Sequence, residues 1–395
     1  MDSPRGRIDL MKGIDEGSLA LSPTVVEHFD KCLGCMACVT ACPSGVRYDL
    51  LIEGTRAKVE ASAARAPNER LLRALLFAFL PYPKRLRFLA LPLALYANSG
   101  VRAFVRRSGL RQLLPPVLAQ FERLSPPLRA ADLRGALPPL TRAHGTKRGT
   151  VALVTGCVQR VFLPNVNAAT VRVLAAEGYD VIVPQRQGCC GALSLHVGRA
   201  SEASTFGARL VAGFGDLDGI DAVLVNAAGC GSTLKQYAEL LDDPRAATFA
   251  TKVRDVTEFL AEVGTVAPRR PLPLRVAYHD ACHLAHAQRV REQPRALLRE
   301  IPGLQLLEIP NGDQCCGSAG VYNLIEPQSA AEIGARKADN VLAVAADVLA
   351  SANPGCTLQI GSILEERGRS LLAAHPIEIL DASIEIVDAS SEVTR

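Results

Sequence analysis

The sequence predicts an α/β protein in which a short cysteine-rich segment and a helical region precede two duplicated α/β domains with parallel sheets. Three observations lead to this fold class. Four cysteines crowd near the N-terminus, the other eight form two copies of one spaced pattern, and strands alternate with helices around both copies. Such alternation is typical of parallel sheets covered by helices. The expected boundaries are 1–60, 61–148, 149–265 and 272–385.

The N-terminal cysteines are spaced for iron. Cys32, Cys35, Cys38 and Cys42, followed by Pro43, form C-x2-C-x2-C-x3-C-P, the run that holds a [4Fe–4S] cluster in bacterial ferredoxins. Zinc is the alternative, but four-cysteine zinc sites usually separate two cysteine pairs by a long spacer. In two-cluster ferredoxins the fourth cysteine ligates the other cluster. Either Cys42 closes its own cluster, or a partner run is missing from this chain. The rest of 1–60 is expected to be polar and rich in turns.

Residues 61–148 are expected to be helical, with a linker at 136–149. Proline breaks are expected at Pro81, Pro83, Pro92, Pro115-Pro116 and Pro126-Pro127. From 71 to 121 there is no acidic residue, and apolar residues separate eight basic ones: Arg73, Lys84, Arg85, Arg87, Arg102, Arg106, Arg107 and Arg111. A basic amphipathic segment suits an anionic membrane surface or an acidic partner subunit. The alternative is a helical packing domain whose arginines are solvated.

The remaining cysteines form two copies of one pattern. The first copy is Cys157, Cys189-Cys190-Gly191 and Cys230, and the second is Cys282, Cys315-Cys316-Gly317 and Cys356. The copies are offset by 125 residues at the first cysteine and by 126 at the others. Strands are predicted at 151–154, 181–183, 222–225, 275–278, 304–309 and 347–350, and helices at 165–177, 200–214 and 330–346. Each cysteine site then follows the carboxyl end of a strand, where open α/β sheets build sites.

Each copy supplies four candidate ligands for a further cluster. Adjacent cysteines diverge on regular backbone, and Gly191 and Gly317 permit the conformations that bring them together. Small buried cysteines that pack as apolar residues are one alternative, although they would not explain the repeat. A catalytic thiol or dithiol, such as Cys189-Cys190, is another.

Four histidines lie near these cysteines in sequence: His196, His279, His283 and His286. They are candidates for hydrogen-bond donors to cluster sulfur or for proton carriers. Helix-capping and core-edge roles are the interpretation that we favour from sequence alone.

The bulk composition narrows the class of protein. The formal net charge of +4 is too small to indicate nucleic-acid binding. No apolar run reaches the roughly 18 residues that a membrane span needs, and the residues after Met1 do not form a secretory signal. There is no G-x-G-x-x-G after a strand, no P-loop and no G-x-S-x-G. We therefore expect a cytoplasmic electron carrier that takes its electrons from another protein.

Several stretches together resemble the iron–sulfur subunits of bacterial glycolate oxidase (glycolate dehydrogenase), a branch of the wider Cys-Cys-Gly domain family. They are DSPRGRIDLMK at 2–12, CLGCMACVTACPSGVRYD at 32–49, TGCVQRVFLPNVNAATVRVLAAEGYDV at 155–181, QGCCGALSLHVGR at 187–199, NAAGCGS at 226–232, YHDACHLAHAQ at 278–288, CCGSAGVYNL at 315–324 and ANPGCTLQIG at 352–361. The resemblance covers nearly the whole chain.

The resemblance implies a subunit that works with FAD-binding glycolate oxidase subunits. The flavin subunit would oxidise glycolate to glyoxylate, and this chain would pass the electrons to a quinone, with 71–121 meeting the quinone or the membrane surface. It implies no catalytic residue on this chain, and a place in the cytoplasm or on the inner face of the membrane. By motif, the N-terminal run matches the second of two ferredoxin runs in the family, and the other eight cysteines match its two Cys-Cys-Gly sets.

Two departures from the family pattern qualify this expectation. The first ferredoxin run usually stands just upstream of DSPRGRI, where this chain has Met1. Our hypothesis is a start assigned too late or a truncated gene. In the heterodisulfide reductase type, the motif ends in C-x2-C, whereas Cys230 and Cys356 lack the second cysteine. This favours four-ligand clusters over disulfide-reducing chemistry.

Three alternative functions stay open at this point. The chain could serve a dehydrogenase for lactate or another 2-hydroxy acid, because the substrate would bind on another chain. It could be a thiol or disulfide reductase subunit of the heterodisulfide reductase type. It could also be a zinc-bound scaffold without electron transfer.

Overall fold

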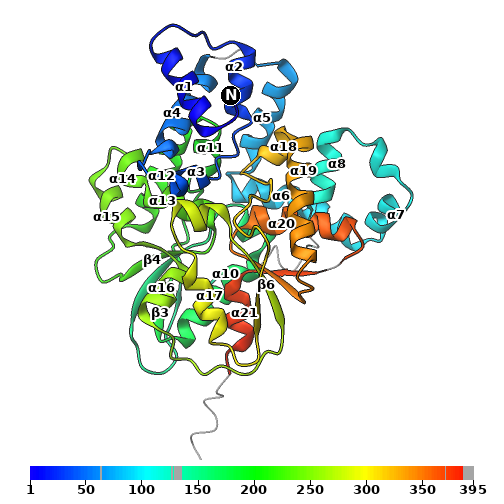
Figure 1. The fold of residues 1–395 in the computed structure, drawn as a ribbon. Helices are drawn as coiled ribbons and strands as arrows, with labels where there is room; N and C mark the ends of the chain where they lie inside the picture. The colour runs from blue at the N-terminus through cyan, green and yellow to red at the C-terminus, as the bar shows by residue number, and fades with distance from the viewer. Residues whose placement is uncertain (63–64, 126–127, 129–135, 370, 386–395) are drawn as a thin grey trace, which may run out of the picture.

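The computed structural model describes residues 1–395 except 63–64, 126–127, 129–135, 370 and 386–395 (Figure 1). The N-terminal segment is more helical than predicted. It folds into α1 (Pro4–Asp15), α2 (Pro23–Asp30), α3 (Ala37–Ala41) and α4 (Tyr48–Ser62). Ser3 and Ser22 accept backbone hydrogen bonds as helix caps, and each precedes a proline in the first turn. This cap-and-proline pair is a recognised start signal for a helix.

The helical region follows as α5 (Pro67–Phe79), α6 (Pro83–Asn98), α7 (Val101–Arg107), the 3-10 turn η1 (Leu110–Leu113) and α8 (Pro116–Leu124). The expected break at Pro92 does not occur, because Ala90 and Ala94 are buried in the same helix and their packing holds α6 together. The expected break at Pro126-Pro127 lies outside the described residues. Within the described part, no single helix meets the length and hydropathy of a membrane span. α6 and α7 meet them only as a pair, bent by 71°.

The first duplicated domain contains a five-stranded sheet in the order β1-β3-β2-β4-β5. Its strands are β1 (Leu140–Thr141), β2 (Gly149–Val154), β3 (Tyr179–Ile182), β4 (Ala222–Val225) and β5 (Val253–Asp255). β1 lies inside the segment expected to be a linker and pairs antiparallel with β3. The other strand pairs of this sheet are parallel. β1 and β5 were not predicted because two or three residues carry too little pattern.

The second duplicated domain repeats this arrangement. Its sheet has the order β7-β6-β8-β9, all parallel, which matches β3-β2-β4-β5 strand for strand. The strands are β6 (Arg275–His279), β7 (Gln305–Glu308), β8 (Val348–Ser351) and β9 (Leu372–Ala374). The duplication inferred from the cysteines is therefore a duplication of topology. β9 was also missed.

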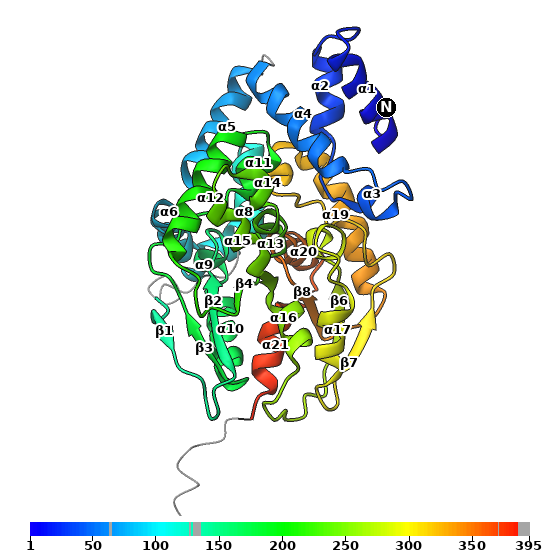
Figure 2. The ribbon, with the colours of Figure 1, turned by 90° about the vertical axis from the view of Figure 1, so that its left-hand side faces the viewer.

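The two sheets share one core. Helices α10 (Pro164–Ala176), α16 (Val256–Val263), α17 (Glu292–Arg299) and α21 (Pro376–Ser383) lie between them (Figure 2). The C-terminal helix α21 packs on α10 of the first domain, where Arg172 and Asp381 form an ion pair at 2.6 Å. One buried cluster contains residues of both sheets and all four helices. The domains are thus held in a fixed relation, with both carboxyl edges toward the N-terminal segment (Figure 2).

The remaining helices cover the outer faces and the carboxyl edges of the sheets. On the first domain, α12 and α13–α15 pack with the alternate residues of β2 and β4, and α19 and α20 pack similarly on the second. Their bounds are α9 (Gln159–Phe162), α11 (Ala192–His196), α12 (Ala200–Phe214), α13 (Ala228–Lys235), α14 (Tyr237–Leu240), α15 (Pro244–Lys252), the π-helical turn η2 (His283–Ala287), α18 (Tyr322–Ile325), α19 (Pro327–Leu342) and α20 (Pro354–Glu366).

Candidate metal centres

The structure brings the four cysteines of the first copy together at one sheet edge. Cys157 follows β2, Cys189 and Cys190 follow β3, and Cys230 lies in α13 after β4. Side-chain hydrogen bonds link Cys189 to Cys157 and to Cys190, and Cys190 to Cys230. The hydrogen bonds that Cys190 accepts from its neighbours lower its pKa well below the ordinary thiol value. A chain of side-chain hydrogen bonds therefore runs through the first set from Cys157 to Cys230.

The turn through each cysteine pair requires glycine. Gly191 and Gly317 have φ values of +83° and +84°, in the left-handed region. A Cβ at Gly191 would lie 2.6 Å from the carbonyl oxygen of Ala203, and one at Gly317 would lie 2.6 Å from that of Ala330. The following amide donates back to the first cysteine of each pair, Cys189 at 3.3 Å and Cys315 at 3.4 Å. The two turns therefore share one backbone geometry and one steric requirement for glycine.

The second copy converges in the same way. Side-chain hydrogen bonds link Cys282 to Cys315, Cys315 to Cys316, and Cys316 to Cys356. The bond to Cys315 and burial raise the pKa of Cys282 well above the ordinary value. All four side chains are buried, whereas Cys230 of the first copy is half-buried.

His279 is an additional member of the second set. A ligand atom of its ring lies within 4.8 Å of the sulfurs of Cys316 and Cys356. The side chain is 1% exposed, and neither ring nitrogen has a hydrogen-bond partner among the described residues. Burial lowers the pKa of His279 to about 3. For this histidine the structure favours a place beside the cysteine ligands over the capping or core-edge role that we favoured from sequence.

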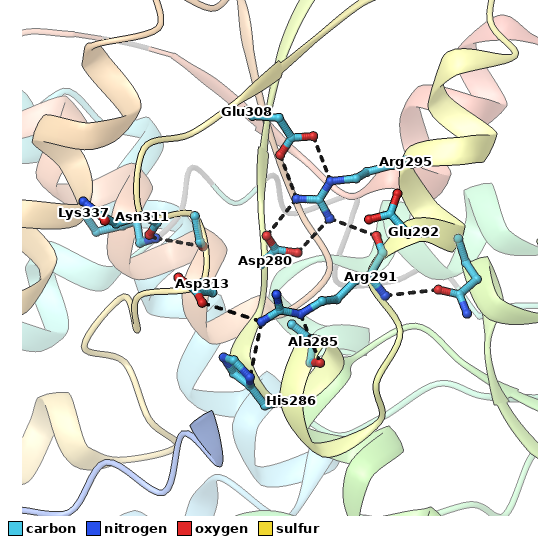
Figure 3. A network of polar contacts seen from close by, with 12 residues as sticks. Asp280, Ala285, His286, Arg291, Glu292, Arg295, Glu308, Asn311, Asp313 and Lys337 are labelled. Atoms are coloured by element: carbon cyan, nitrogen blue, oxygen red, sulfur yellow. Dashed lines mark hydrogen bonds and ion pairs between the residues drawn. The ribbon is translucent and has the colours of Figure 1, made fainter. Parts of the chain in front are cut away.

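Charged residues close to the second set in sequence form a network of polar contacts, which Figure 3 shows around Arg291 and Arg295. Arg295 binds Asp280 through two contacts of 2.9 and 2.8 Å and Glu308 through two of 2.8 Å. These bonds tie the end of β7 to the residues just before Cys282. The buried ammonium of Lys337 donates to the carbonyls of Asn311 and Gly312 at 3.1 and 3.0 Å. Burial lowers the pKa of Lys337, and the nearby thiols of Cys316, Cys356 and Cys315 oppose that shift.

The N-terminal run is divided in the structure. Cys32, Cys35 and Cys38 are close enough to affect one another's ionisation, and burial raises the pKa of Cys38 to about 11. Backbone amides of Val46 and Ser44 instead lower the pKa of Cys42, and none of the other cysteines contributes to that shift. The surroundings of Cys42 thus differ from those of the other three cysteines. Which cluster Cys42 ligates stays a prediction.

The N-terminal run lies against the second set. Cys35 interacts electrostatically with Cys282 and Cys315. Thr40 and His286 are hydrogen-bonded at 2.8 Å, with the tautomer of the ring deciding the donor. On the other side, Arg56 donates to the backbone oxygen of His196 at 2.8 Å. The N-terminal segment is thus fixed to both duplicated domains.

A histidine pair connects the two duplicated sets. The rings of His196 and His283 lie 4.8 Å apart, and the Nδ1 of His283 is 2.8 Å from the hydroxyl of Ser232. Both rings and seven of the eight cysteines of these two sets line one cavity. The two duplicated sets therefore share one cavity.

The donor sets fit iron–sulfur clusters. All twelve cysteines are free thiols, and each duplicated set presents four soft sulfur ligands, all of them buried except the half-buried Cys230. The glycine turn brings two adjacent sulfurs to the same side, as a shared cluster requires. Cys157, Cys189, Cys190 and Cys230 would hold one cluster, Cys282, Cys315, Cys316 and Cys356 another, and Cys32, Cys35 and Cys38 would supply three ligands of a third.

Sequence reasoning missed Lys337 and undervalued His279. A signal for both was present in the repeat. His279 and Val154 occupy equivalent places, since each ends a central strand and pairs with the end of the next one. Lys337 and Leu210 each stand seven residues after the alanine that meets the turn glycine. Comparison of the two copies residue by residue would have exposed both differences.

Family comparisons agree with this anatomy. Residues 151–235 and 276–361 match the family described as "Cysteine-rich domain". Residues 68–125 match "Glycolate oxidase iron-sulfur subunit, linker region", and residues 25–48 match "4Fe-4S binding domain". The clusters inferred from the thiols are therefore [4Fe–4S] clusters, and the chain has the parts of an electron-transfer subunit.

Curated relatives extend over nearly the whole chain. A "Probable glycolate oxidase iron-sulfur subunit" of Bacillus subtilis (strain 168) is 36% identical over 96% of this chain and 87% of its own length. The "Glycolate oxidase iron-sulfur subunit" of Escherichia coli (strain K12) is 32% identical over 98% and 89%. A "Lactate utilization protein A" of Shouchella clausii (strain KSM-K16) is 29% identical over 59% of this chain. The chain belongs to the family of glycolate oxidase iron–sulfur subunits.

Proposed function

We propose that this chain relays electrons within a complex that oxidises glycolate to glyoxylate. Electrons enter from a flavin-bearing partner subunit and leave to a quinone. The observation that carries the proposal is the proximity of the cysteine sets. Cys35 lies close enough to Cys282 and Cys315 to interact with them electrostatically, and both duplicated sets line one cavity. Clusters bound there supply one-electron chemistry, and this chain positions them in a continuous row.

The proposal that glycolate is the substrate rests on how much of this chain each relative matches. The relatives named for glycolate oxidase match 96% and 98% of this chain, whereas the relative named for lactate utilization matches 59%. Residues 68–125 of the helical region match a family that is itself named for glycolate oxidase. No observation favours a disulfide reductase, since Cys189 and Cys190 are each only 2% exposed.

We also propose that the complex sits on the inner face of an anionic membrane through the helical region. Twelve of the nineteen exposed large apolar side chains in the described part fall between 71 and 121. Phe88, Leu95 and Phe104 are 77%, 62% and 64% exposed. Lys84 and Arg85 stand beside Phe88 on α6, and both are exposed. An apolar face flanked by cations is the composition of an interfacial helix.

Cys35→Ser tests the relay. The substitution removes one ligand of the N-terminal set, so electron delivery from glycolate to a quinone should be lost. Glycolate oxidation coupled to an artificial dye that accepts electrons from the flavin should survive. Ser44→Ala, in the same loop but outside the set, should retain both activities. Equal loss of quinone and dye reduction in Cys35→Ser would contradict a pure relay role.

Replacement of Phe88 and Leu95 by Asp tests the membrane surface. Both side chains are exposed, so folding should persist, while flotation of the complex with vesicles of anionic lipid should fall. Each lost apolar contact is expected to cost roughly 1–3 kcal/mol of binding. Val266→Asp, at a side chain 61% exposed outside the helical region, is the control. Unchanged flotation of the double variant would remove this surface from the proposal.

A further inference from the structure

A cavity joins the cysteine sets to the helical region. It has a volume of about 980 Å³. At its inner end it is lined by cysteines of both duplicated sets, among them Cys190, Cys230 and Cys356. At its outer end it is lined by apolar side chains of α6, η1 and α8 and the residues beside them. A cluster needs only the space next to its ligands. The part of the cavity walled by α6, η1 and α8 is therefore available to a different ligand.

The outer end opens onto the exposed apolar surface. Leu89, Leu110, Leu113, Leu118 and Phe121 line the cavity and are also 39–80% exposed. The same side chains therefore wall the cavity and belong to the surface that we assign to the membrane. A lipophilic molecule could pass from the bilayer into the cavity without crossing water.

The inner end offers a hydrogen-bonding group. His196 lines the cavity, and its Nδ1 lies 3.3 Å from a carboxylate oxygen of Glu53. Its Nε2 is buried and has no partner among the described residues. An oriented imidazole with one free nitrogen suits the oxygen of a quinone or quinol. Buried polar groups are normally satisfied, so an unpaired one at a cavity wall points to a ligand.

We propose that this cavity is the binding site of a lipid-soluble quinone. The ring lies near His196 beside the space that the clusters occupy, and the isoprenoid tail lies along α6, η1 and α8 toward the membrane. This proposal deepens the proposed function and rests on it. Two electrons from the oxidised hydroxy acid, delivered through the clusters, and two protons from water convert the quinone to the quinol.

Leu89→Trp tests the site in the whole complex. Leu89 lines the cavity, whereas Val266, outside the helical region, is 61% exposed and does not line it. Filling the cavity at Leu89 should weaken use of a short-chain ubiquinone about tenfold or more, seen as a raised KM. Reduction of the clusters by glycolate should stay unchanged. Val266→Trp should behave as wild type in both assays.

An azido-quinone gives a readout that does not depend on activity. After illumination of the intact complex, label should map to residues 110–121 or to α6, and excess plain ubiquinone should suppress it. Label confined to another subunit, or a Leu89→Trp complex with unchanged KM, would overturn the cavity assignment. A wild-type complex that reduces a dye but neither reduces nor binds ubiquinone would overturn the proposed acceptor itself.

Discussion

The two duplicated domains share their ligand geometry but differ in what surrounds it. In the first domain, the neutral Gln187 ties the cysteine loops to β2, accepting from the amide of Thr155 at 2.9 Å and donating to Leu153 at 3.1 Å. In the second domain, Arg295 performs the corresponding task with Asp280 and Glu308. Val154 and Leu210 in the first domain are replaced by His279 and Lys337 in the second. Duplication has preserved where the sulfurs lie, and divergence has changed the electrostatics around them.

This difference has a consequence for electron flow. A nearby cation and polar N–H groups favour the reduced, more negative state of a cluster and so raise its reduction potential. The second set has a buried lysine and a buried histidine, and it also lies against the N-terminal run. We therefore expect the second cluster to have a higher potential than the first.

The largest expected effect on stability comes from removing the ion pairs that Arg295 forms with Asp280 and Glu308. Arg295→Ala leaves Asp280 buried without its partner, which should cost about 3–5 kcal/mol of stability. Gln187→Ala removes neutral hydrogen bonds from the first domain and should cost about 1–3 kcal/mol. Thermal unfolding of the anaerobic complex, with iron counted per chain, measures both. If Gln187→Ala lost as much stability as Arg295→Ala, the neutral hydrogen bonds of the first domain and the ion pairs of the second would be energetically alike.

The turn glycines should give matched effects. Gly191→Ala and Gly317→Ala each place a Cβ 2.6 Å from a backbone oxygen at positive φ, a strain of roughly 1–3 kcal/mol from φ alone. Each should remove the EPR signal of its own domain and spare the other. Gly361→Ala, where a Cβ meets nothing within 4 Å, is the control. Loss of both signals from either variant would mean that the sites assemble as one unit.

The smallest effect, and the one that sharpens the comparison most, concerns potential. His279→Val and Lys337→Leu give the second set the residues of the first. Both should lower the potential of the second cluster toward that of the first, with the iron content unchanged, as followed by an EPR-monitored redox titration. Lys12→Leu, an exposed lysine of α1, should have no effect. An unshifted potential in both variants would show that His279 and Lys337 do not influence the reduction potential of the second cluster.

Local pattern was enough to predict the duplicated framework. The cysteine spacing and the turn glycines indicated which residues converge, and the core strands lie within one or two residues of their predicted bounds. Helix α19 ends at Leu342 rather than at 346, and short strands escaped because they carry little periodicity. These are errors of boundary, and they leave the site unaffected.

The surroundings of the sites could not be predicted in the same way. Arg73, Arg102 and Arg106 counted as free cations in the acid-free stretch, but Glu69, Glu122 and Glu365 from outside it bind them at 2.6–3.2 Å. A window of sequence does not contain such partners. The cavity could not be predicted from the sequence either, because helices and loops that are distant in sequence form its walls. Tertiary contacts decide which charges and apolar faces remain exposed.

The most direct test of the relay is reduction of the clusters by substrate. The complex would be purified without oxygen, and glycolate and then D-lactate would be added to separate samples. Bleaching of the cluster absorption and EPR signals of the reduced clusters would be followed. We predict reduction by glycolate, with signals from both duplicated domains. Clusters that dithionite reduces but glycolate does not would contradict a role for this chain in glycolate oxidation.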